Sequence, residues 1–387
     1  MNHLMTTYRR LPVAFVRGSG AYLEDTSGKR YLDALSGIAV CGLGHAHPAV
    51  TRALSEQAAT LLHTSNLYEV PLQSELADRL CRISGMDRVF FGNSGAEANE
   101  AAIKLARLRA HKRGVKDPAI VVVEDSFHGR TLATLTATGS RKAQAGFEPL
   151  VKGFVRAPYN DLAAISLIAD NNPDVVAILV EPVLGEGGIL IPDDDYLAGL
   201  RRICDEHNWL LMLDEVQTGN GRTGTFFAYQ QSGILPDVVT TAKGLGNGMP
   251  IGACLARGEA ADVLQAGNHG STFGGNLLAC AAGLAVLDTL ESENLMPRAA
   301  ELGERIVNGL RSALSGNNQV VAVRGKGLMI GIEFRDPCTE LVAAALEAGV
   351  LINVTHDTVV RLLPPLILTD AEADDLIARV ARVLNGG

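Results

Sequence analysis

The chain has 387 residues, of which 47% are hydrophobic and 20% charged, and its formal net charge is −9. This much apolar material can fill the core of a large domain with a smaller companion, and no run approaches the roughly 18 uninterrupted apolar residues of a membrane span. The negative charge and the lack of a Lys/Arg tract argue against a nucleic-acid or anionic-membrane partner, so small molecules are the expected partners.

The N-terminus and the cysteines narrow the class of protein further. The opening "MNHLMTTYRRLP" lacks the apolar stretch of a signal peptide, so we expect a cytoplasmic protein. The six cysteines lie far apart without a CxxC pair, which favours reduced and mostly buried thiols. His45 and His47 resemble a metal pair only superficially, because a turn at the start of a helix explains them better, and we expect no metal site.

Apolar runs alternate with helical patterns through the middle of the chain. The runs that we expect to be strands are 87–91, 119–125, 175–182, 209–216 and 237–243. Because these runs are nearly continuous in apolar residues rather than alternating, they fit strands of a parallel sheet that is covered on both faces. Strands and helices that take turns predict an α/β architecture.

The pattern changes after residue 285. Residues 285–314 predict a long amphipathic helix with a break at Pro297, and 369–385 predict a final capped helix. Two short strands are expected within 323–334 and 359–368. The predicted parts are an N-terminal segment that joins the small domain, a large ligand-binding domain and a small α+β C-terminal domain, at 1–50, 51–285 and 286–387.

Lys243 differs from the other lysines, because it comes at the end of a predicted buried strand, in "VVTTAKGLGNGMP". Burial favours the neutral amine, lowers its pKa and makes it able to form a Schiff base with an aldehyde. A lysine at a strand edge whose amine reaches solvent is the alternative. The lysine precedes the glycines, unlike in a P-loop, and the spacing does not match the dinucleotide fingerprint G-x-G-x-x-G.

Asp214 follows five apolar residues in "WLLMLDEVQTG". A carboxylate at the end of such a strand needs a cationic partner or dense hydrogen bonding. A pyridinium nitrogen would serve, because ionised Asp214 would keep it protonated and strengthen the ring as an electron sink. An aspartate that caps a turn is the alternative.

The stretch "FFGNSGAEANEAAIK" reads as strand, small polar turn and helix. Ser94, Gly95 and Ala96 would offer backbone N–H groups and the positive end of the helix to a phosphate. An ordinary capping box between Ser94 and Glu97 is the alternative. Thr272, in a second small polar loop before a helix, could supply a hydroxyl to the same anion.

An aromatic residue and an arginine follow another strand, in "VVVEDSFHGRTL". Phe127 could stack on a flat heterocycle, and Arg130 could bind a carboxylate through two parallel hydrogen bonds. A packed phenylalanine and a surface arginine are the alternatives. His128 gets no catalytic role, because a lone histidine in a turn is more often structural.

Taken together, these motifs resemble the fold-type I pyridoxal phosphate enzymes, specifically the class III (ω-amino group) aminotransferases. The resemblance runs from "YLDALSGIAVCGLGHAHP" to "VVRLLPPLIL", which is nearly the whole chain. It implies an α/β fold with a mainly parallel central sheet flanked by helices and a smaller α+β C-terminal domain. It also implies pyridoxal 5'-phosphate as the cofactor.

The resemblance implies a role for each matching residue. Lys243 would hold the cofactor covalently and shuttle a proton, and Asp214 would pair with the pyridine nitrogen. The other residues that would contact the cofactor are Ser94, Gly95, Ala96, Phe127, Val216, Gln217 and Thr272. Thr272 would reach the phosphate from the partner subunit, which implies a homodimer with shared active sites.

On the substrate side, the resemblance points to residues that bind carboxylates. Arg130 is similar to the family arginine that grips a substrate carboxylate, and Arg361 to the one that meets the α-carboxylate of glutamate. Glu186 would neutralise Arg361 when that carboxylate is absent, and Ser271 belongs to the same set. Without the resemblance, Arg361 is a strand-end arginine paired with any nearby acid, and Glu186 a loop residue in solvent.

The motifs are most similar to the branch of the family that transfers the ω-amino group of N-acetylornithine to 2-oxoglutarate, giving a semialdehyde and glutamate in arginine biosynthesis. Ornithine, succinylornithine, succinyl-diaminopimelate and 4-aminobutyrate are alternative substrates, and a non-catalytic binding protein is an alternative of another class. The presence of both Lys243 and Asp214 argues against a binding protein. Asn247, Leu184 and Cys41 depart from the usual family pattern and could alter the substrate preference.

Overall fold

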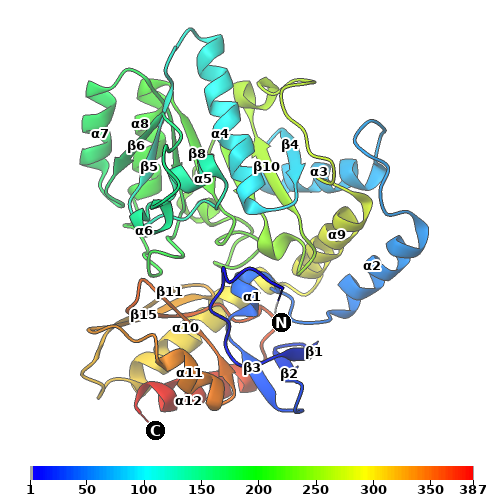
Figure 1. The fold of residues 1–387 in the computed structure, drawn as a ribbon, viewed down its shortest axis with the longest axis vertical. Coiled ribbons are helices and arrows are strands. Elements are labelled where there is room, and N and C mark those ends of the chain that lie inside the picture. The colour runs from blue at the N-terminus through cyan, green and yellow to red at the C-terminus, as the bar shows by residue number, and fades with distance from the viewer. Residues whose placement is uncertain (1–2, 387) are drawn as a thin grey trace.

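A seven-stranded sheet forms the centre of the computed structural model, which describes residues 3–386 (Figure 1). The strand order is β4-β10-β9-β8-β7-β5-β6. The strands are β4 (Arg88–Gly92), β5 (Ala119–Val123), β6 (Phe154–Ala157), β7 (Val175–Val180), β8 (Leu210–Asp214), β9 (Val238–Thr241) and β10 (Gly252–Ala256). β10 runs antiparallel to both of its neighbours, and the other neighbouring pairs are parallel. The predicted mainly parallel sheet is confirmed.

Both faces of this sheet are buried. Leu211 and Leu213 of β8 belong to one hydrophobic cluster, whereas Leu210 and Met212 belong to another. Because successive side chains of a strand point to opposite faces, the two clusters are the two sides of the sheet. This double burial explains why the strands appear in the sequence as nearly continuous apolar runs.

Helices form the layers on the two faces of the sheet and the links between strands. Those associated with the large sheet are α3 (Pro71–Ser84), α4 (Gly95–Lys112), α5 (Leu132–Ala137), α6 (Arg141–Gln144), α7 (Leu162–Asn171), α8 (Tyr196–His207) and α9 (Leu277–Ser292). Short 3-10 helices are η1 (Ala228–Ser232), η2 (Lys243–Leu245) and η3 (Gly258–Asp262). None of the helices within residues 3–386 combines the length and the apolar character that a membrane span needs.

All five strands that the apolar runs predicted are present, as β4, β5, β7, β8 and β9. The sequence analysis did not predict β6 and β10. β10 has the sequence GACLA, whose small residues carry little preference for strands, and it forms between β4 and β9 because the sheet buries it on both sides. Tertiary packing, rather than local sequence, decides this strand.

Two smaller sheets lie beside the large one. The first has the order β1-β2-β3-β13, and the second β11-β12-β15-β14. Their strands are β1 (Phe15–Ser19), β2 (Tyr22–Asp25), β3 (Arg30–Asp33), β11 (Val320–Lys326), β12 (Met329–Phe334), β13 (Val350–Leu351), β14 (Asn353–Thr355) and β15 (Val359–Leu362). The remaining helices are α1 (Ser36–Ala39), α2 (Pro48–Thr60), α10 (Leu295–Ala313), α11 (Leu341–Glu347) and α12 (Asp370–Leu384).

The N-terminal segment shares a sheet with the C-terminal part of the chain. β13 pairs in parallel with β3, and Figure 1 shows the blue N-terminal strands next to the orange and red C-terminal elements. This pairing supports the expectation that residues 1–50 join the small domain. The expected boundary at residue 285 falls inside α9, and the three-part division stays a prediction.

The predicted helix break at Pro297 is wrong in its position. α9 ends at Ser292 and α10 begins at Leu295, and Asn294 between them has a left-handed backbone, with φ 53°. Pro297 lies in the first turn of α10, where the missing N–H costs nothing because those donors have no partner within the helix. The predicted final helix is confirmed, since Thr369 and Glu372 form a capping box at the start of α12.

Candidate active site

The carboxyl ends of the parallel strands surround a cavity of about 450 Å³. Its lining comes from the segments that follow β4, β5, β7, β8 and β9, and from Val40 after α1. Ligand sites of open α/β sheets form at this edge, because the loops that connect strand to helix converge there. The cavity therefore lies where the strand-end motifs predicted a site.

Lys243 enters this cavity from the end of β9. It is the first residue of η2, and its backbone has φ 45°, a left-handed value that is uncommon for a residue other than glycine. Burial lowers the pKa of Lys243 to about 8, and the positive charge of Arg361 acts in the same direction. The fold thus holds the backbone of Lys243 in a strained conformation, and burial makes its amine easier to deprotonate.

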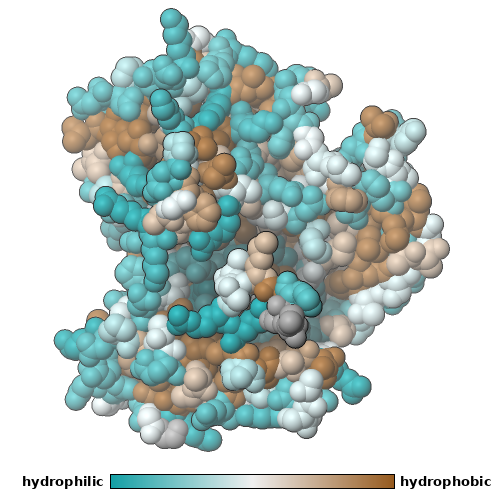
Figure 2. All heavy atoms as spheres, viewed as in Figure 1, coloured by the Kyte–Doolittle hydropathy of each residue, from teal (hydrophilic) through white to brown (hydrophobic). Residues whose placement is uncertain are grey.

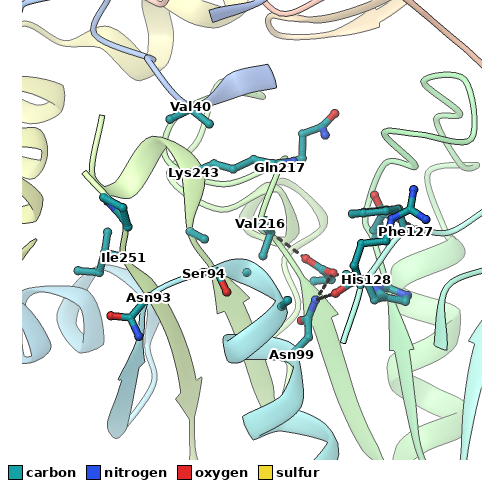
Figure 3. Close-up of a pocket in the computed structure, with 18 of the residues that line it drawn as sticks. Val40, Asn93, Ser94, Asn99, Phe127, His128, Val216, Gln217, Lys243 and Ile251 are labelled. Carbon is teal, nitrogen blue, oxygen red and sulfur yellow. Dashed lines mark hydrogen bonds and ion pairs between the residues drawn. The ribbon is translucent and has the colours of Figure 1, made fainter. Parts of the chain in front are cut away.

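Asp214, the last residue of β8, is held by three donors. Its Oδ2 accepts hydrogen bonds from Nδ2 of Asn99 at 2.7 Å and from Nδ1 of His128 at 2.7 Å, and its Oδ1 accepts one from the backbone N–H of Val216 at 3.0 Å. Figure 3 labels Asn99, His128 and Val216 in this pocket, with dashed lines for interactions between the residues drawn. These three hydrogen bonds fix the direction of a carboxylate that is only 3% exposed.

Asn99 and His128 are site residues that the sequence analysis missed. Asn99 of α4 also donates to the backbone oxygen of His128 at 2.9 Å and accepts from Oγ1 of Thr240 at 2.7 Å, so it ties a helix to two strand ends. Nε2 of His128 is buried and has no hydrogen-bond partner within residues 3–386. The position of His128 in the loop after β5, next to Phe127, was the available signal.

The start of α4 forms a tight turn next to the cavity. The hydroxyl of Ser94 caps the helix by accepting from the N–H of Glu97 at 3.2 Å. A methyl group on Gly95 would come within 2.7 Å of Cγ1 of Val216, so this position has room only for glycine. Ser94, Gly95 and Ala96 all line the cavity, as the phosphate prediction requires.

Phe127 and Arg130 lie together on the loop after β5. Both line the cavity, and the guanidinium of Arg130 lies 5.4 Å from the centre of the Phe127 ring. Arg130 is exposed, so its charge remains available to an incoming anion. Phe127, Val216 and Gln217 are all labelled around the same pocket in Figure 3.

Arg361 of β15 approaches the site from the small sheets. It is completely buried, and its Nη1 lies 2.6 Å from Oε1 of Glu186, which lines the cavity. Nε of Arg361 donates to Oδ1 of Asn353 at 3.1 Å, and Nη1 also reaches Oε1 of Gln217 at 3.4 Å. Its Nη2 is buried without a partner in the described part of the chain, so one donor of the guanidinium is unused.

Ser271 and Thr272 lie outside this cavity of the single chain. Oγ of Ser271 accepts from Nδ2 of Asn93 at 3.2 Å and from the N–H of Gly274 at 3.0 Å, while Thr272 is exposed.

Among residues 3–386, no group of three or more His, Cys, Asp or Glu side chains is arranged to hold a metal ion. The site thus brings together every predicted residue except Ser271, Thr272 and the fully buried Arg361, which lies directly behind Glu186.

Comparison with known proteins identifies the family of the chain. The sequence profile described as Aminotransferase class-III matches residues 5–384. The chain belongs to the class-III aminotransferase family. It is 58% identical over 384 residues to acetylornithine aminotransferase of Nitrosomonas europaea, covering 99% of this chain and 98% of that one. It is 56% identical to acetylornithine aminotransferase 1 of Bordetella pertussis, covering 97% and 95% of the two chains.

Solved structures place this class-III aminotransferase among the fold-type I enzymes. Ornithine aminotransferase of Toxoplasma gondii superimposes with a TM-score of 0.96 at 34% identity, covering 99% of this chain and 92% of the other. Acetylornithine aminotransferase of Elizabethkingia anophelis superimposes with a TM-score of 0.90 at 34% identity, covering 100% and 97%. The predicted family and fold class are confirmed.

The residues of the cavity suit pyridoxal phosphate. The group has a cationic ring nitrogen, an aldehyde, a flat aromatic face and a phosphate. Asp214 offers a buried negative charge, Lys243 an amine with a lowered pKa, and Phe127 an aromatic face, all lining one cavity. The turn at Gly95, which a Cβ would fill, leaves the helix N-terminus open to a phosphate.

Proposed function

We propose that this aminotransferase moves the ω-amino group of N-acetylornithine to 2-oxoglutarate with the help of pyridoxal phosphate, giving N-acetylglutamate 5-semialdehyde and glutamate. The observation that carries the proposal is the 58% identity over 384 residues to an acetylornithine aminotransferase. Ornithine aminotransferase of Toxoplasma gondii, whose structure superimposes on this chain, is only 34% identical to it. Ornithine is therefore the second candidate substrate. Arginine biosynthesis in the cytoplasm is the setting that we propose for this reaction.

When bound, pyridoxal phosphate supplies an aldehyde that can link to amines and a ring that takes up electrons. In our proposal, ionised Asp214 holds the ring nitrogen protonated, and Asn99 and His128 keep the carboxylate in place. Phe127 and Val216, which both line the cavity, would contact the two faces of the ring. The backbone N–H groups at Ser94 to Ala96 would bind the phosphate.

Lys243 has two tasks in the proposed reaction. Its Nζ would hold the cofactor between turnovers and, once free again as an amine, would accept a proton from the substrate carbon that bears the amino group. The pKa of about 8 suits both tasks, because a group that takes up and returns protons works best near the ambient pH.

Carboxylate binding is shared between two arginines in this proposal. Exposed Arg130 binds the carboxylate of N-acetylornithine, and Arg361 binds a carboxylate of glutamate after Glu186 has moved away. The exposed fraction of the Glu186 side chain is 38%, against 0% for Arg361, so Glu186 is the partner that can leave. One site can thus accept substrates with one or two carboxylates.

We propose a homodimer, for which an exposed apolar surface gives support. Leu67, Tyr68 and Phe273 have exposed fractions of 87%, 70% and 59%, and Thr272 lies beside Phe273. Asn66 joins these segments, because its Nδ2 donates to the backbone oxygens of Ser271 and Gly274, each at 3.1 Å. Figure 2 shows hydrophobic side chains gathered over α2 and the loop that follows it. A second copy would cover this surface and receive Thr272 at its phosphate site.

A panel of amino donors tests the proposed reaction. Glutamate formation from 2-oxoglutarate would be measured with N-acetylornithine, ornithine, succinylornithine and 4-aminobutyrate. We expect the highest kcat/KM for N-acetylornithine. A preference for unacylated ornithine would overturn the substrate assignment, and binding without turnover of any donor would favour a non-catalytic protein.

A further inference from the structure

Glu181 is a buried carboxylate that the proposed reaction does not use. It follows the end of β7, lines the cavity and is only 5% exposed. Its Oε1 accepts a hydrogen bond from the backbone N–H of Phe127 at 2.8 Å, and its Oε2 accepts one from the N–H of Gly185 at 3.1 Å. Each oxygen of one side chain therefore binds a different loop of the site.

The two loops carry the groups that would contact the substrate. The first includes Phe127 and Arg130, and the second includes Gly185 and Glu186. They also pack directly on each other, because a methyl group on Gly187 would come within 2.8 Å of the backbone oxygen of Asp125. The two loops therefore touch at Gly187, and Glu181 joins them at a second place.

The second loop is also tied to the small sheets. Nε of Arg324 donates to the backbone oxygen of Ile189 at 2.7 Å, and its Nη2 donates to that of Gly188 at 2.6 Å. The hydroxyl of Thr355 donates to the backbone oxygen of Glu186. Glu181, which follows β7 of the large sheet, binds the same loop through Gly185.

We propose that Glu181 is a positioning residue, whose ionised carboxylate holds the Phe127–Arg130 loop at a fixed distance from the Gly185–Glu186 loop and so shapes the substrate end of the cavity. The identity of the substrate rests on the proposed function, but the tie between the loops does not. Loss of the charge leaves one of the two buried N–H groups without a good acceptor, which releases one loop.

The surroundings of Glu181 make this tie sensitive to pH. Burial raises the pKa of Glu181 to about 7, and the negative charge of Asp214 acts in the same direction, while His128 opposes it. Tyr159 and Lys243 are titratable groups that also interact with Glu181. Because a protonated carboxyl keeps only one good acceptor oxygen, the tie weakens as the pH falls through about 7.

The chain offers a matched control in Glu215. This residue is also buried, its pKa is also raised to about 7 by burial, and its two oxygens also accept backbone N–H groups, from Ala228 and Tyr229, each at 3.0 Å. It does not line the cavity. A Glu→Gln change at either position removes the same charge from a similar environment, and only one of them touches the substrate loops.

Hydrogen–deuterium exchange of the substrate-free enzyme tests the inference. In Glu181→Gln we expect faster exchange at Phe127 and Gly185 by about tenfold, with Ala228 and Tyr229 unchanged, and in Glu215→Gln the reverse pattern. The wild-type enzyme should show the same loosening of Phe127 and Gly185 between pH 8 and pH 6, after correction for the intrinsic rate, and this measurement needs no variant.

Kinetics give the second readout. Glu181→Gln should raise the KM for the amino donor by about tenfold, with a smaller effect on kcat. The rates of the wild type and of Glu215→Gln should fall as the pH drops through about 7, whereas the rate of Glu181→Gln should not. Equal exchange at Phe127 and Gly185 in Glu181→Gln and the wild type would overturn the proposal. Since the exchange pattern is read without substrate, failure of N-acetylornithine as a donor would leave the inference standing and sink only the substrate assignment.

Discussion

Arg361 and Glu186 form an ion pair in which the arginine side chain is buried and the glutamate side chain is partly exposed, with 2.6 Å between Nη1 of the arginine and Oε1 of the glutamate. The arginine is fixed in β15 and inaccessible, whereas the glutamate belongs to a loop at the cavity wall. An unpaired charge at the position of Arg361 would be costly, so the structure needs some carboxylate there at all times. Either Glu186 or a carboxylate of the substrate can meet this need.

Replacement of Glu186 by Gln should therefore shift the preference between the two substrates. We expect the KM for glutamate to fall about tenfold, because its carboxylate no longer competes with Glu186, and kcat/KM for N-acetylornithine to fall by a similar factor. Steady-state kinetics with each donor measure this. Glu259→Gln, which breaks a remote pair with Arg109, is the control and should change neither constant. Parallel changes for both donors would contradict the exchange of carboxylates.

Asp214→Asn should remove most of the activity without unfolding the chain. Asparagine keeps the shape and can still accept from Val216, but it has no charge to hold a ring nitrogen protonated. We expect kcat to fall on the order of 10²- to 10³-fold, with a melting temperature within a few degrees of the wild type. Turnover close to that of the wild type would show that Asp214 has a structural role alone.

The sequence predicted the residues that line the cavity better than the residues that hold them in place. Lys243 and Asp214 stood out because a charged residue at the end of a buried strand is physically unusual and needs an explanation. Asn99 lies in a stretch of α4 that mixes alanines with polar residues and does not show which side chains face solvent, and only the packing of α4 on the sheet brings it to Asp214. Glu181 was hidden in the same way, since its partners are backbone groups that no sequence pattern displays.

Attachment of pyridoxal phosphate to the apoenzyme should follow the protonation of Lys243. Only a neutral amine attacks an aldehyde, and a lowered pKa makes that form available at lower pH. Because the pKa of Lys243 is about 8, we expect the rate to rise about tenfold per pH unit below 8 and to level off above it. Borohydride trapping and mass spectrometry at Lys243 measure the rate. A rise that continues to pH 10 would indicate an ordinary lysine, and Lys243→Ala should give no attachment.

Asn247 is a departure from the family pattern that the structure explains. Its backbone is left-handed, with φ 46°, and its side chain clamps the segment before α2. Oδ1 accepts from the N–H of Leu43 at 2.8 Å, and Nδ2 donates to the backbone oxygen of Gly44 at 3.1 Å. The two hydrogen bonds join the loop of Lys243 to the segment that follows Val40, a residue that lines the cavity.

Two variants of Asn247 separate the clamp from the backbone conformation. Asn247→Gly loses both hydrogen bonds but accepts a positive φ freely, so the free energy of unfolding should fall by about 1–2 kcal/mol. Asn247→Ala loses the same bonds and in addition strains the backbone, which should cost about 1–2 kcal/mol more. Urea unfolding of the two variants measures the order. If glycine proved as stable as asparagine, the two hydrogen bonds would contribute nothing, and the asparagine would be there only because its backbone tolerates the left-handed turn.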